Sequence, residues 1–193
     1  VKDYFTGFFM LLENQVHQGD VVEVAGLGGL VEEITLRYIR LRDYEGSVHF
    51  IPNGAVTTVT YRSRGYAYAL VDIGVAYREN IEAVFDVIRE VGAEMRADET
   101  LGPLILEDLD LAGVDAWADS AVTIRFRIKV RPLQQWTVKR AFLLRLKKEF
   151  DRLGIEIPFP HVTVYPGQAK DGSAPPLRLS IQEQAEPRHA RNP

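Results

Sequence analysis

The sequence predicts an α+β protein: an N-terminal helix stub, a small bent β-domain, a ferredoxin-like β-α-β-β-α-β domain and a disordered C-terminal tail. Three observations support this class. Short β-branched runs fill residues 19–62, apolar residues recur at helical spacing in two later segments, and apolar and polar residues alternate strictly over 121–131. We place the boundaries of the four parts at 1–17, 18–64, 65–165 and 166–193.

The composition is that of a globular chain. Of 193 residues, 46% are hydrophobic and 26% are charged, which excludes wholesale disorder. The net charge of −4 weighs against nucleic-acid binding, which usually requires a basic surface. Cysteine is absent, which excludes disulfides and thiolate metal sites. No window supplies the roughly 20 apolar residues that cross a bilayer. Because the chain starts with Val and shows no leader, we expect a fragment of a longer protein.

Residues 4–16 predict a helix that is apolar on more than one face. Phe5, Phe9, Leu12 and Val16 share one face at helical spacing. The rest of the first two turns is also apolar, which is typical of a helix buried on all sides or lying in lipid. On this pattern alone, a helix packed against its own domain is the favoured alternative.

The β-domain is predicted from short strands separated by turn residues. The expected strands cover 21–24, 30–34, 36–41 and 48–51. We expect turns at Gly26–Gly29 and at Asp43–Gly46, the latter with Asp first and Gly last as a type I turn prefers. Pro52 should end the last of these strands, and Asn53-Gly54 should start a turn or a short capped helix.

The second domain is predicted from two amphipathic helices and an alternating strand. The first helix should begin at the N-cap Asn80 and stop at Gly92, and the second should end just before Gly154. The apolar residues of the second helix that we expect to be buried are Val138, Phe142, Leu146, Phe150 and Leu153. Strands are expected at 71–75, 104–109 and 121–131, and residues 155–164 should be extended. The tail holds five of the ten prolines and no aromatic residue, so we expect it to be disordered.

Candidate chemistry is sparse. The histidines at 17, 49, 161 and 189 are scattered, and no catalytic or nucleotide-binding motif appears. We therefore expect no catalytic residue, no metal and no cofactor, and we expect that the protein is not an enzyme. The carboxylates Glu107, Asp108 and Asp110 are more consistent with a solvated strand end than with an acid–base pair. A basic face over 125–131 favours a solvated or subunit-facing surface over an RNA platform, because no aromatic stacking motif accompanies it.

Several motifs in order resemble the MscS-like family of small-conductance mechanosensitive channels. They are "GFFMLLE" followed by "QGDVVEV", then "GGLVEEITLRYIRLRDYEG", "VHFIPNG" and "LGIEIPFPHVTVY", with "GVAY" at the head of the second domain. Each motif is weak alone, but together they are specific, and the similarity covers residues 1 to about 165.

This resemblance implies a homoheptameric channel in the cell's inner membrane, with this portion on the cytoplasmic side. In that family an Sm-like β-domain and a ferredoxin-like domain form a hollow cage with lateral openings. The resemblance also implies contact with membrane lipid through upstream helices, permeating ions and osmolytes as partners, and no nucleic acid. Residues 1 to about 14 would correspond to the lower half of the pore helix, with Thr6, Gly7 and Leu11 at its end.

The resemblance also assigns signature positions in both domains. Those of the β-domain are Gly19, Asp20, Gly29, Pro52, Asn53 and Gly54, and those at the end of the cage are Gly154, Pro158 and Pro160. We expect the lateral openings near Tyr66, Tyr68 and Leu70.

The function implied by the resemblance is a channel that opens under membrane tension and releases ions and small osmolytes during hypo-osmotic stress. Two alternatives remain. One is a soluble RNA-binding scaffold, because the Sm-like and ferredoxin-like folds both host RNA binders. The other is a small enzyme of acylphosphatase type, in which Arg78 would hold phosphate, although no glycine-rich cradle surrounds it.

Overall fold

The computed structural model describes residues 16–160 and residue 162. Within these residues, no helix has both the length and the apolar composition needed to cross a membrane. The predicted helix over residues 4–16, apart from Val16, and the predicted tail over 166–193 lie outside the described residues.

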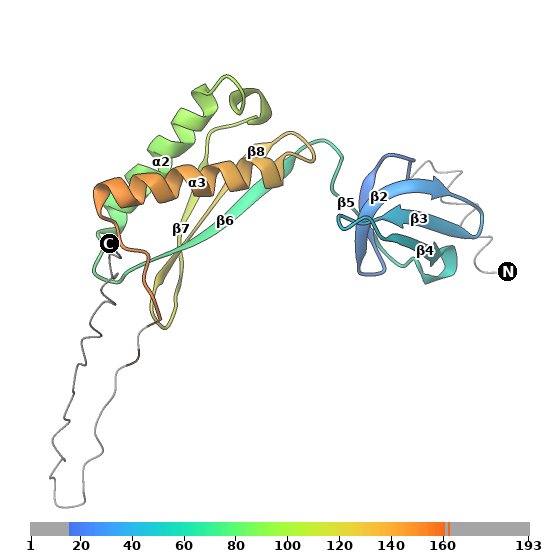
Figure 1. The fold of residues 1–193 in the computed structure, drawn as a ribbon, viewed down its shortest axis with the longest axis horizontal. Helices are drawn as coiled ribbons and strands as arrows, with labels where there is room; N and C mark the ends of the chain where they lie inside the picture. Colours follow the sequence, from blue (N-terminus) through green and yellow to red (C-terminus); the bar gives the residue numbers. More distant parts are fainter. Residues whose placement is uncertain (1–15, 161, 163–193) are drawn as a thin grey trace, which may run out of the picture. The chain divides into compact units, whose positions relative to one another are not determined.

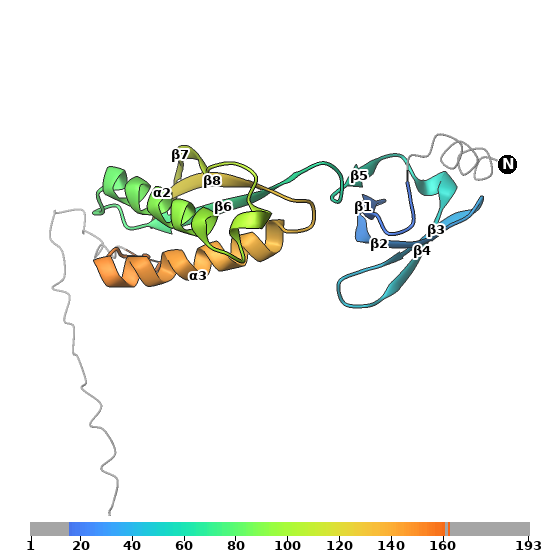
Figure 2. The ribbon, with the colours of Figure 1, turned by 90° about the horizontal axis from the view of Figure 1, so that it is seen from above.

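The first domain, residues 16–64, is built on an antiparallel five-stranded sheet and is called the β-domain below (Figures 1 and 2). Its strands are β1 (Val21–Val24), β2 (Leu27–Ile34), β3 (Tyr38–Arg42), β4 (Val48–Pro52) and β5 (Val59–Tyr61). The strand order is β4-β3-β2-β1-β5, so the last strand pairs with the first. A short 3₁₀ helix, η1 (Asn53–Ala55), follows β4.

Within residues 16–64, seven buried apolar residues form the small core of the β-domain. They are Val16, Val22, Val24, Val31, Ile39, Leu41 and Ile51. A β-bulge interrupts the pairing of β2 with β3 between Val31 and Glu33, and such a bulge bends the strand. The predicted small, bent β-domain is therefore confirmed.

Two turns of the β-domain differ from the prediction in position. β1 and β2 are joined by Ala25 and Gly26, whose φ angles of 51° and 78° fit the two-residue type I′ hairpin. The predicted turn over Gly26–Gly29 was therefore wrong, because Leu27 already begins β2. The third strand begins at Tyr38 rather than at residue 36, because the Thr35 hydroxyl accepts the backbone N–H groups of Arg37 and Tyr38 and holds them in a turn.

The turn at Asp43–Gly46 forms as predicted. The Asp43 carboxylate accepts the backbone N–H groups of Glu45 (3.0 Å) and Ser47 (2.8 Å), and Gly46 N–H donates to the Asp43 carbonyl. Gly46 has a φ of 93°, which favours glycine.

The second domain, called the α/β domain below, has two helices on one face of a three-stranded sheet (Figures 1 and 2). Its elements are β6 (Ala67–Val75), α2 (Ile81–Ala97), η2 (Gly102–Leu104), β7 (Asp110–Trp117), β8 (Val122–Val130) and α3 (Gln135–Leu153). Both strand pairs are antiparallel, and the order is β6-β8-β7. The α+β class is confirmed.

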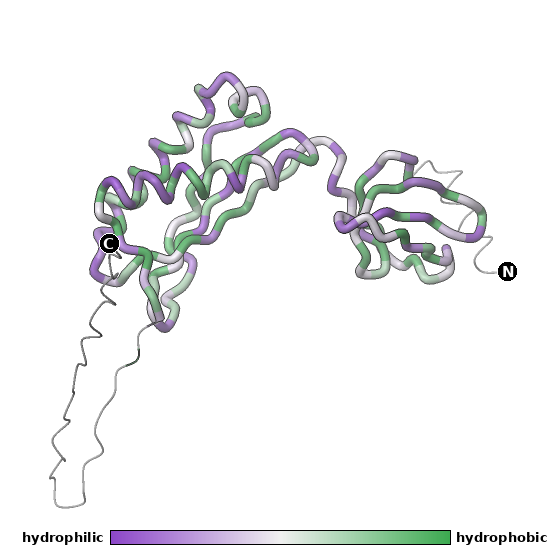
Figure 3. Tube along the Cα trace, viewed as in Figure 1, coloured by the Kyte–Doolittle hydropathy of each residue, from purple (hydrophilic) through white to green (hydrophobic). Residues whose placement is uncertain are grey.

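The alternation predicted over 121–131 appears as β8. Its buried residues are Val122, Ile124, Phe126, Ile128 and Val130, and they face the helices. Figure 3 shows hydrophobic and hydrophilic residues alternating along the strands. From α3, Val138, Phe142, Leu146 and Phe150 are buried as predicted, whereas Leu153 is exposed in the last turn.

The start of α2 was predicted correctly, but its end was not. The Asn80 side chain accepts the backbone N–H groups of Glu82 and Ala83, as an N-cap does. Gly92 is not the stop, because α2 continues to Ala97. A Cβ at Gly92 would lie 3.0 Å from the Leu109 Cβ, so this glycine permits close packing inside the helix.

The strand predicted at 104–109 lies later in the chain. Residues 102–104 form η2, after a turn in which the Asp98 carboxylate accepts the N–H groups of Thr100 and Leu101. Ile105 makes only an isolated bridge to Val130. The ladder of β7 begins at Asp110. The prediction placed the strand on the apolar run 104–109, whereas the strand that pairs with β8 is the following segment, Asp110–Trp117.

The segment after α3 has no strand in the described residues. The order β6-β8-β7 is the ferredoxin-like order without its last strand, which would pair with the open edge of β6. Residues 155–160 are connected to the end of β6 by the hydrogen bond from Ala76 N–H to the Glu156 carbonyl. Pro158 and Pro160 have no N–H to donate to a ladder.

Candidate functional site

The sequence predicts functional positions at the entry of the β-domain, within it, and along β6 and the end of the α/β domain. Thr6, Gly7 and Leu11, the predicted end of the pore helix, lie outside the described residues. The other predicted positions are described below.

Gly19 and Asp20 form the entry to the β-domain. Gly19 has a φ of 92°, and its N–H donates to the Val31 carbonyl at 2.8 Å. The Val31 N–H donates in return to the Asp20 carbonyl, also at 2.8 Å. This reciprocal pair fixes the chain against β2 immediately before β1 begins, and the positive φ explains the glycine.

The Asp20 carboxylate connects this entry to the exit of the domain. It accepts hydrogen bonds from the His17 backbone N–H (3.1 Å), the Arg64 guanidinium (3.2 Å) and the Ser63 hydroxyl (3.3 Å). The Ser63 hydroxyl also accepts the Val21 N–H at 3.2 Å. Arg64 in addition contacts His17 Nδ1 at 2.9 Å.

The electrostatics of Asp20 follow from these contacts. Burial raises the pKa of Asp20, but the bonds from His17, Arg64 and Ser63 outweigh it, so the net pKa lies below its ordinary value. The charged carboxylate is therefore the form that these donors stabilise. Asp20 was predicted as a signature residue, whereas Ser63 and Arg64 were missed, because nothing local in the sequence indicates that they lie beside it.

Gly29 in β2 is a position where only glycine fits. A Cβ built there would lie 2.5 Å from the Arg42 carbonyl oxygen, a backbone atom that cannot move aside. The neighbouring Gly28 has open space around the same position. The signature glycine thus permits close approach of β2 to the end of β3.

Pro52, Asn53 and Gly54 form the corner after β4. Pro52 is the last residue of β4, and Asn53 and Gly54 lie in η1. Asn53 is completely buried, and its side-chain amide donates to the Thr35 carbonyl at 2.9 Å while its N–H donates to the Arg37 carbonyl. Asn53 therefore joins two loops and does not cap the helix, since no side-chain cap bond is present in η1.

Gly154, Pro158 and Pro160 lie at the end of the α/β domain. Gly154 ends α3 in the left-handed conformation, with a φ of 71° and its N–H on the Phe150 carbonyl, as predicted from its position. Pro158 and Pro160 lie in the segment after α3, in which the described residues form no helix or strand.

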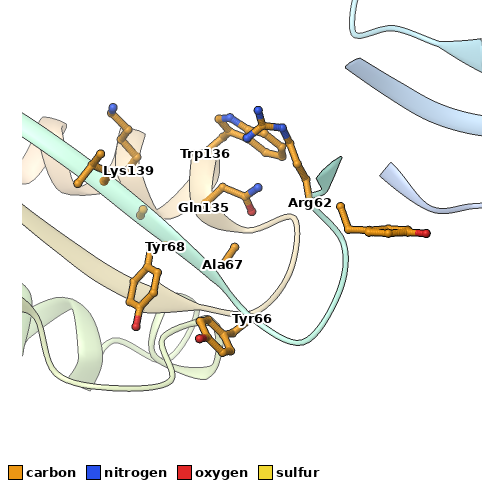
Figure 4. Close-up of a pocket in the computed structure, with 10 residues that line it drawn as sticks. Arg62, Tyr66, Ala67, Tyr68, Gln135, Trp136 and Lys139 are labelled. Carbon is orange, nitrogen blue, oxygen red and sulfur yellow. The ribbon is translucent and has the colours of Figure 1, made fainter. Parts of the chain in front are cut away.

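Tyr66, Tyr68 and Leu70 follow each other on the uncovered face of the sheet, at and within β6. Each is between 37% and 52% exposed. Figure 4 shows Tyr66 and Tyr68 on one side of β6, and Gln135, Trp136 and Lys139 on its other side, where α3 lies. The two tyrosine rings meet edge to face at 5.5 Å.

Three of the four cations on the predicted basic face, Arg125, Arg127 and Lys129, have carboxylate partners, and the fourth is Arg131. The Lys129 ammonium lies 4.3 Å from the centre of the Tyr66 ring, and the Arg127 guanidinium lies 4.4 Å from that of Tyr68. These two cations and Arg125 also form ion pairs with carboxylates. The pairs are Lys129–Glu107, Arg127–Asp110, Arg125–Asp72 and Arg125–Asp115. Pairing of three of its four cations with carboxylates reduces the positive charge that this face could offer to a polyanion.

The pKa shifts on this face have the same cause. The hydrogen bond to Glu107 raises the pKa of Lys129, and the hydrogen bond from Arg125 lowers the pKa of Asp72. Glu107 and Asp110 are thus ion-pair partners of a strand face, in line with the solvated role expected for them. Sequence reasoning identified the cations but not these pairings, which depend on strand register.

The two chemical sites considered from the sequence were a metal centre and a phosphate site. No group of three or more histidine or carboxylate side chains in the described part of the chain could hold a metal ion. Arg78, the candidate phosphate ligand, forms an ion pair with Glu156 instead.

Comparison with known proteins identifies the family. The model for the β-domain of mechanosensitive ion channels matches residues 1–62, and the model for the C-terminal domain of the mechanosensitive channel MscS matches residues 69–157. The chain belongs to the MscS family of mechanosensitive channels. This is a family of ion channels and not a class of enzymes, and nothing in the comparisons supports an RNA-binding scaffold.

Relatives in several organisms share this similarity. The small-conductance mechanosensitive channel of Caldanaerobacter subterraneus subsp. tengcongensis is 34% identical over 88% of this chain and 59% of its own length. The moderate conductance mechanosensitive channel YbiO of Escherichia coli is 30% identical over 91% of this chain and 24% of its own length. The chain therefore spans between a quarter and three fifths of the length of these two relatives.

The fold of the MscS family is also found among solved structures. The closed-state crystal structure of Helicobacter pylori MscS superimposes with a TM-score of 0.74 at 21% identity, covering 87% of this chain and 66% of that one. Arabidopsis thaliana MSL1 superimposes with a TM-score of 0.62 at 14% identity, covering 82% of this chain. These likenesses establish the shared fold of the two domains.

Proposed function

We propose that this chain is the cytoplasmic part of one subunit of a channel that opens under membrane tension and releases ions and small osmolytes during hypo-osmotic stress. The observation that carries the proposal is the order of the two family matches, β-domain first and MscS C-terminal domain second. The chain also folds into one domain for each match.

In this proposal each segment has its own role. Residues 1–17 are the end of the pore-lining helix, with Thr6, Gly7 and Leu11 in it, and upstream residues supply the rest of the membrane part. Residues 18–64 and 65–165 form the wall of a hollow cage on the cytoplasmic side of the inner membrane.

The proposed assembly is a homo-oligomer, specifically a heptamer. Two features of the described residues support assembly. Both sheets are open, with β4 and β5 at the edges of one and β6 and β7 at the edges of the other. Large apolar side chains are also exposed, among them Phe50 (61%), Trp117 (83%) and Phe159 (81%).

The proposed mechanism is a shift of population. Membrane tension does work on the conformation with the larger in-plane area, so stretching the bilayer favours the open pore. Solutes then leave the cell and turgor falls. This mechanism requires no covalent chemistry.

A hypo-osmotic shock tests this function. The full-length protein should protect bacterial cells that lack their own mechanosensitive channels when they are transferred from high to low osmolarity. Cells with the empty vector are the control. Equal lysis of both strains, with the protein present in the membrane, would contradict the proposal.

The proposed lateral openings near Tyr66, Tyr68 and Leu70 have a test of their own. Leu70→Glu in the full-length channel should move the reversal potential in a salt gradient toward cation preference, because it places negative charge at the opening. Leu144→Glu is the matched control, since Leu144 is an exposed leucine (59%) of α3. Identical reversal potentials for wild type and Leu70→Glu would exclude an opening at this position.

A further inference from the structure

The chain enters and leaves the β-domain at the same end of one strand pair. β1 and β5 are antiparallel, with Val22 opposite Tyr61 and Val24 opposite Val59. The segment before β1 and the segment after β5 therefore leave the sheet side by side, as the two arms of a fork. The last backbone bond at the fork runs from Arg62 N–H to the Val21 carbonyl at 2.9 Å.

This geometry makes the strand pair weak against one direction of force. When the two arms of an antiparallel pair are pulled apart, the ladder bonds are loaded one after another rather than together, because the bonds lie perpendicular to the strands. β5 is only three residues long, so few ladder bonds resist this opening. Whatever holds the arms together at the fork bears the force first.

Side chains hold the arms together at that point. Asp20 on the entering arm binds Ser63 and Arg64 on the leaving arm, and Arg64 also reaches His17. We call these four residues the fork clasp. The Asp20 side chain is 18% exposed, and the Arg64 guanidinium is further positioned 4.1 Å from the centre of the Tyr61 ring. Hydrogen bonds to a charged, partly buried group are stronger than those between neutral groups.

We infer that the fork clasp transmits force from the segment that enters the β-domain to the segment that leaves it, with Asp20 as the positioning residue. The inference rests on the proposed function, in which the entering arm continues from the pore helix and the leaving arm continues into the α/β domain. A pull on the entering arm then reaches the α/β domain through the clasp, without first opening the β1–β5 pair.

Single-molecule pulling on this chain tests the clasp directly. The native chain has no cysteine, so introduced cysteines give unique attachment points. With attachments at Lys2→Cys and Tyr66→Cys, the force separates the two arms. Asp20→Asn should raise the rate of the first rupture at constant force about tenfold, because it weakens hydrogen bonds to a charged group. Ser63→Ala should have a smaller effect in the same direction.

A second pulling direction separates force transmission from general destabilisation. With attachments at Lys2→Cys and Glu45→Cys, the leaving arm is free of load, and Asp20→Asn should leave the first rupture rate unchanged within about twofold. Glu32→Gln is the control carboxylate, because Glu32 pairs with Arg40 and Arg42 away from the fork. Equal acceleration in both directions, or acceleration by Glu32→Gln equal to that by Asp20→Asn, would overturn the inference.

The consequence for gating is measured in the full-length channel. Asp20→Asn should shift the tension at half-opening, whereas Glu32→Gln should not. If wild type opens under tension and Asp20→Asn has the wild-type midpoint, the inference about the clasp fails and the proposed function stands. If wild type does not open under tension, the proposed function fails, while the pulling experiment still decides whether the clasp bears force.

Discussion

Among the residues that the structure describes, eighteen buried residues form the core of the α/β domain, whereas seven form that of the β-domain. The larger core lies between two helices and one sheet face. The smaller domain adds specific polar and close contacts: Gly29 lies against the Arg42 carbonyl, the Asn53 amide donates to the Thr35 carbonyl, and Asp20 accepts from Arg64 at the fork.

This difference indicates which substitutions should destabilise each domain. In the α/β domain, stability follows the apolar area that is buried, so many residues share the contribution. In the β-domain, a few backbone contacts decide whether the strands can approach each other. Three of the motifs that resemble the family, "QGDVVEV", "GGLVEEITLRYIRLRDYEG" and "VHFIPNG", lie in the smaller domain.

The largest expected loss of stability follows a substitution at the centre of the larger core, that of the α/β domain. Phe126 is fully buried, and its ring lies 4.9 Å from that of Phe142. Phe126→Ala should destabilise the α/β domain by about 3–5 kcal/mol, because it removes apolar contacts and leaves a cavity. Both tryptophans, Trp117 and Trp136, lie in this domain, so tryptophan fluorescence during urea unfolding measures the change.

The control for this prediction is a phenylalanine of the β-domain. Phe50 is 61% exposed on β4, and Phe50→Ala should cost the β-domain less than about 1 kcal/mol, measured by hydrogen exchange of its amides because neither tryptophan lies in that domain. Comparable losses in the two variants would mean that burial does not distinguish the two positions.

The next largest loss of stability is expected where two strands of the β-domain approach each other closely, at Gly29. Gly29→Ala places a Cβ 2.5 Å from the Arg42 carbonyl oxygen, so β2 and β3 must separate. We expect a loss of about 1–3 kcal/mol, the usual cost of overpacking. Hydrogen exchange of the β1–β3 amides measures it.

The neighbouring glycine supplies a matched control. Gly28 has nothing within 4 Å of its built Cβ position, so Gly28→Ala should change exchange rates little. If the two variants behave alike, close approach at Gly29 is not what this position requires.

Sequence reasoning predicted the parts of the fold that a local pattern determines. β8 was identified because five apolar residues alternate on its covered face, and Asn80 because a cap lies beside its own helix. Gly92 was misjudged, because a glycine packed against Leu109 looks in sequence like a helix stop. The strand at 104–109 was misplaced, because this apolar run resembles a strand in sequence, whereas residues 102–104 form η2 and the ladder of β7 begins only at Asp110.

The same limit applies to the site. Asp20, Gly29 and Asn53 were singled out from motifs, and the structure supplies a physical reason for each. Ser63 and Arg64 could not be found in this way, because they lie 43 and 44 residues from Asp20 and meet it only through the pairing of β5 with β1. Those assignments of function to signature residues stay predictions.

A smaller effect concerns an ion pair of the α/β domain and its dependence on pH. The backbone N–H of Leu101, with the Arg145 guanidinium and the Thr100 N–H, lowers the pKa of Asp98 to about 2. Because the folded-state pKa lies below the unfolded one, the stabilisation is complete above about pH 4 and is lost as the pH falls through about 2. Asp98→Asn should flatten the fall of the melting temperature between these pH values.

The control is a carboxylate in the same domain with little burial. Asp108 has a side chain that is 89% exposed, and Asp108→Asn should retain the wild-type acid dependence. If the melting temperature of Asp98→Asn falls with pH as that of the wild type does, this carboxylate does not link the end of α2 to α3.

The smallest effect is expected on the uncovered face of the sheet. Arg127 pairs with Asp110 at 2.8 Å, but the two side chains are 48% and 58% exposed. Arg127→Gln should therefore cost less than about 1 kcal/mol, and the loss should shrink further in high salt. Urea unfolding at low and high salt measures this. A larger loss would mean that the ion pairs on the uncovered face contribute to stability on the scale of the buried residues on the covered face.

The most direct test of the account is the response of the full-length protein to tension in an excised membrane patch. Suction should evoke discrete currents whose open probability rises steeply with tension, in a protein whose mass corresponds to seven copies. A patch that contains the assembled protein and conducts nothing up to the tension at which the bilayer ruptures would contradict the account.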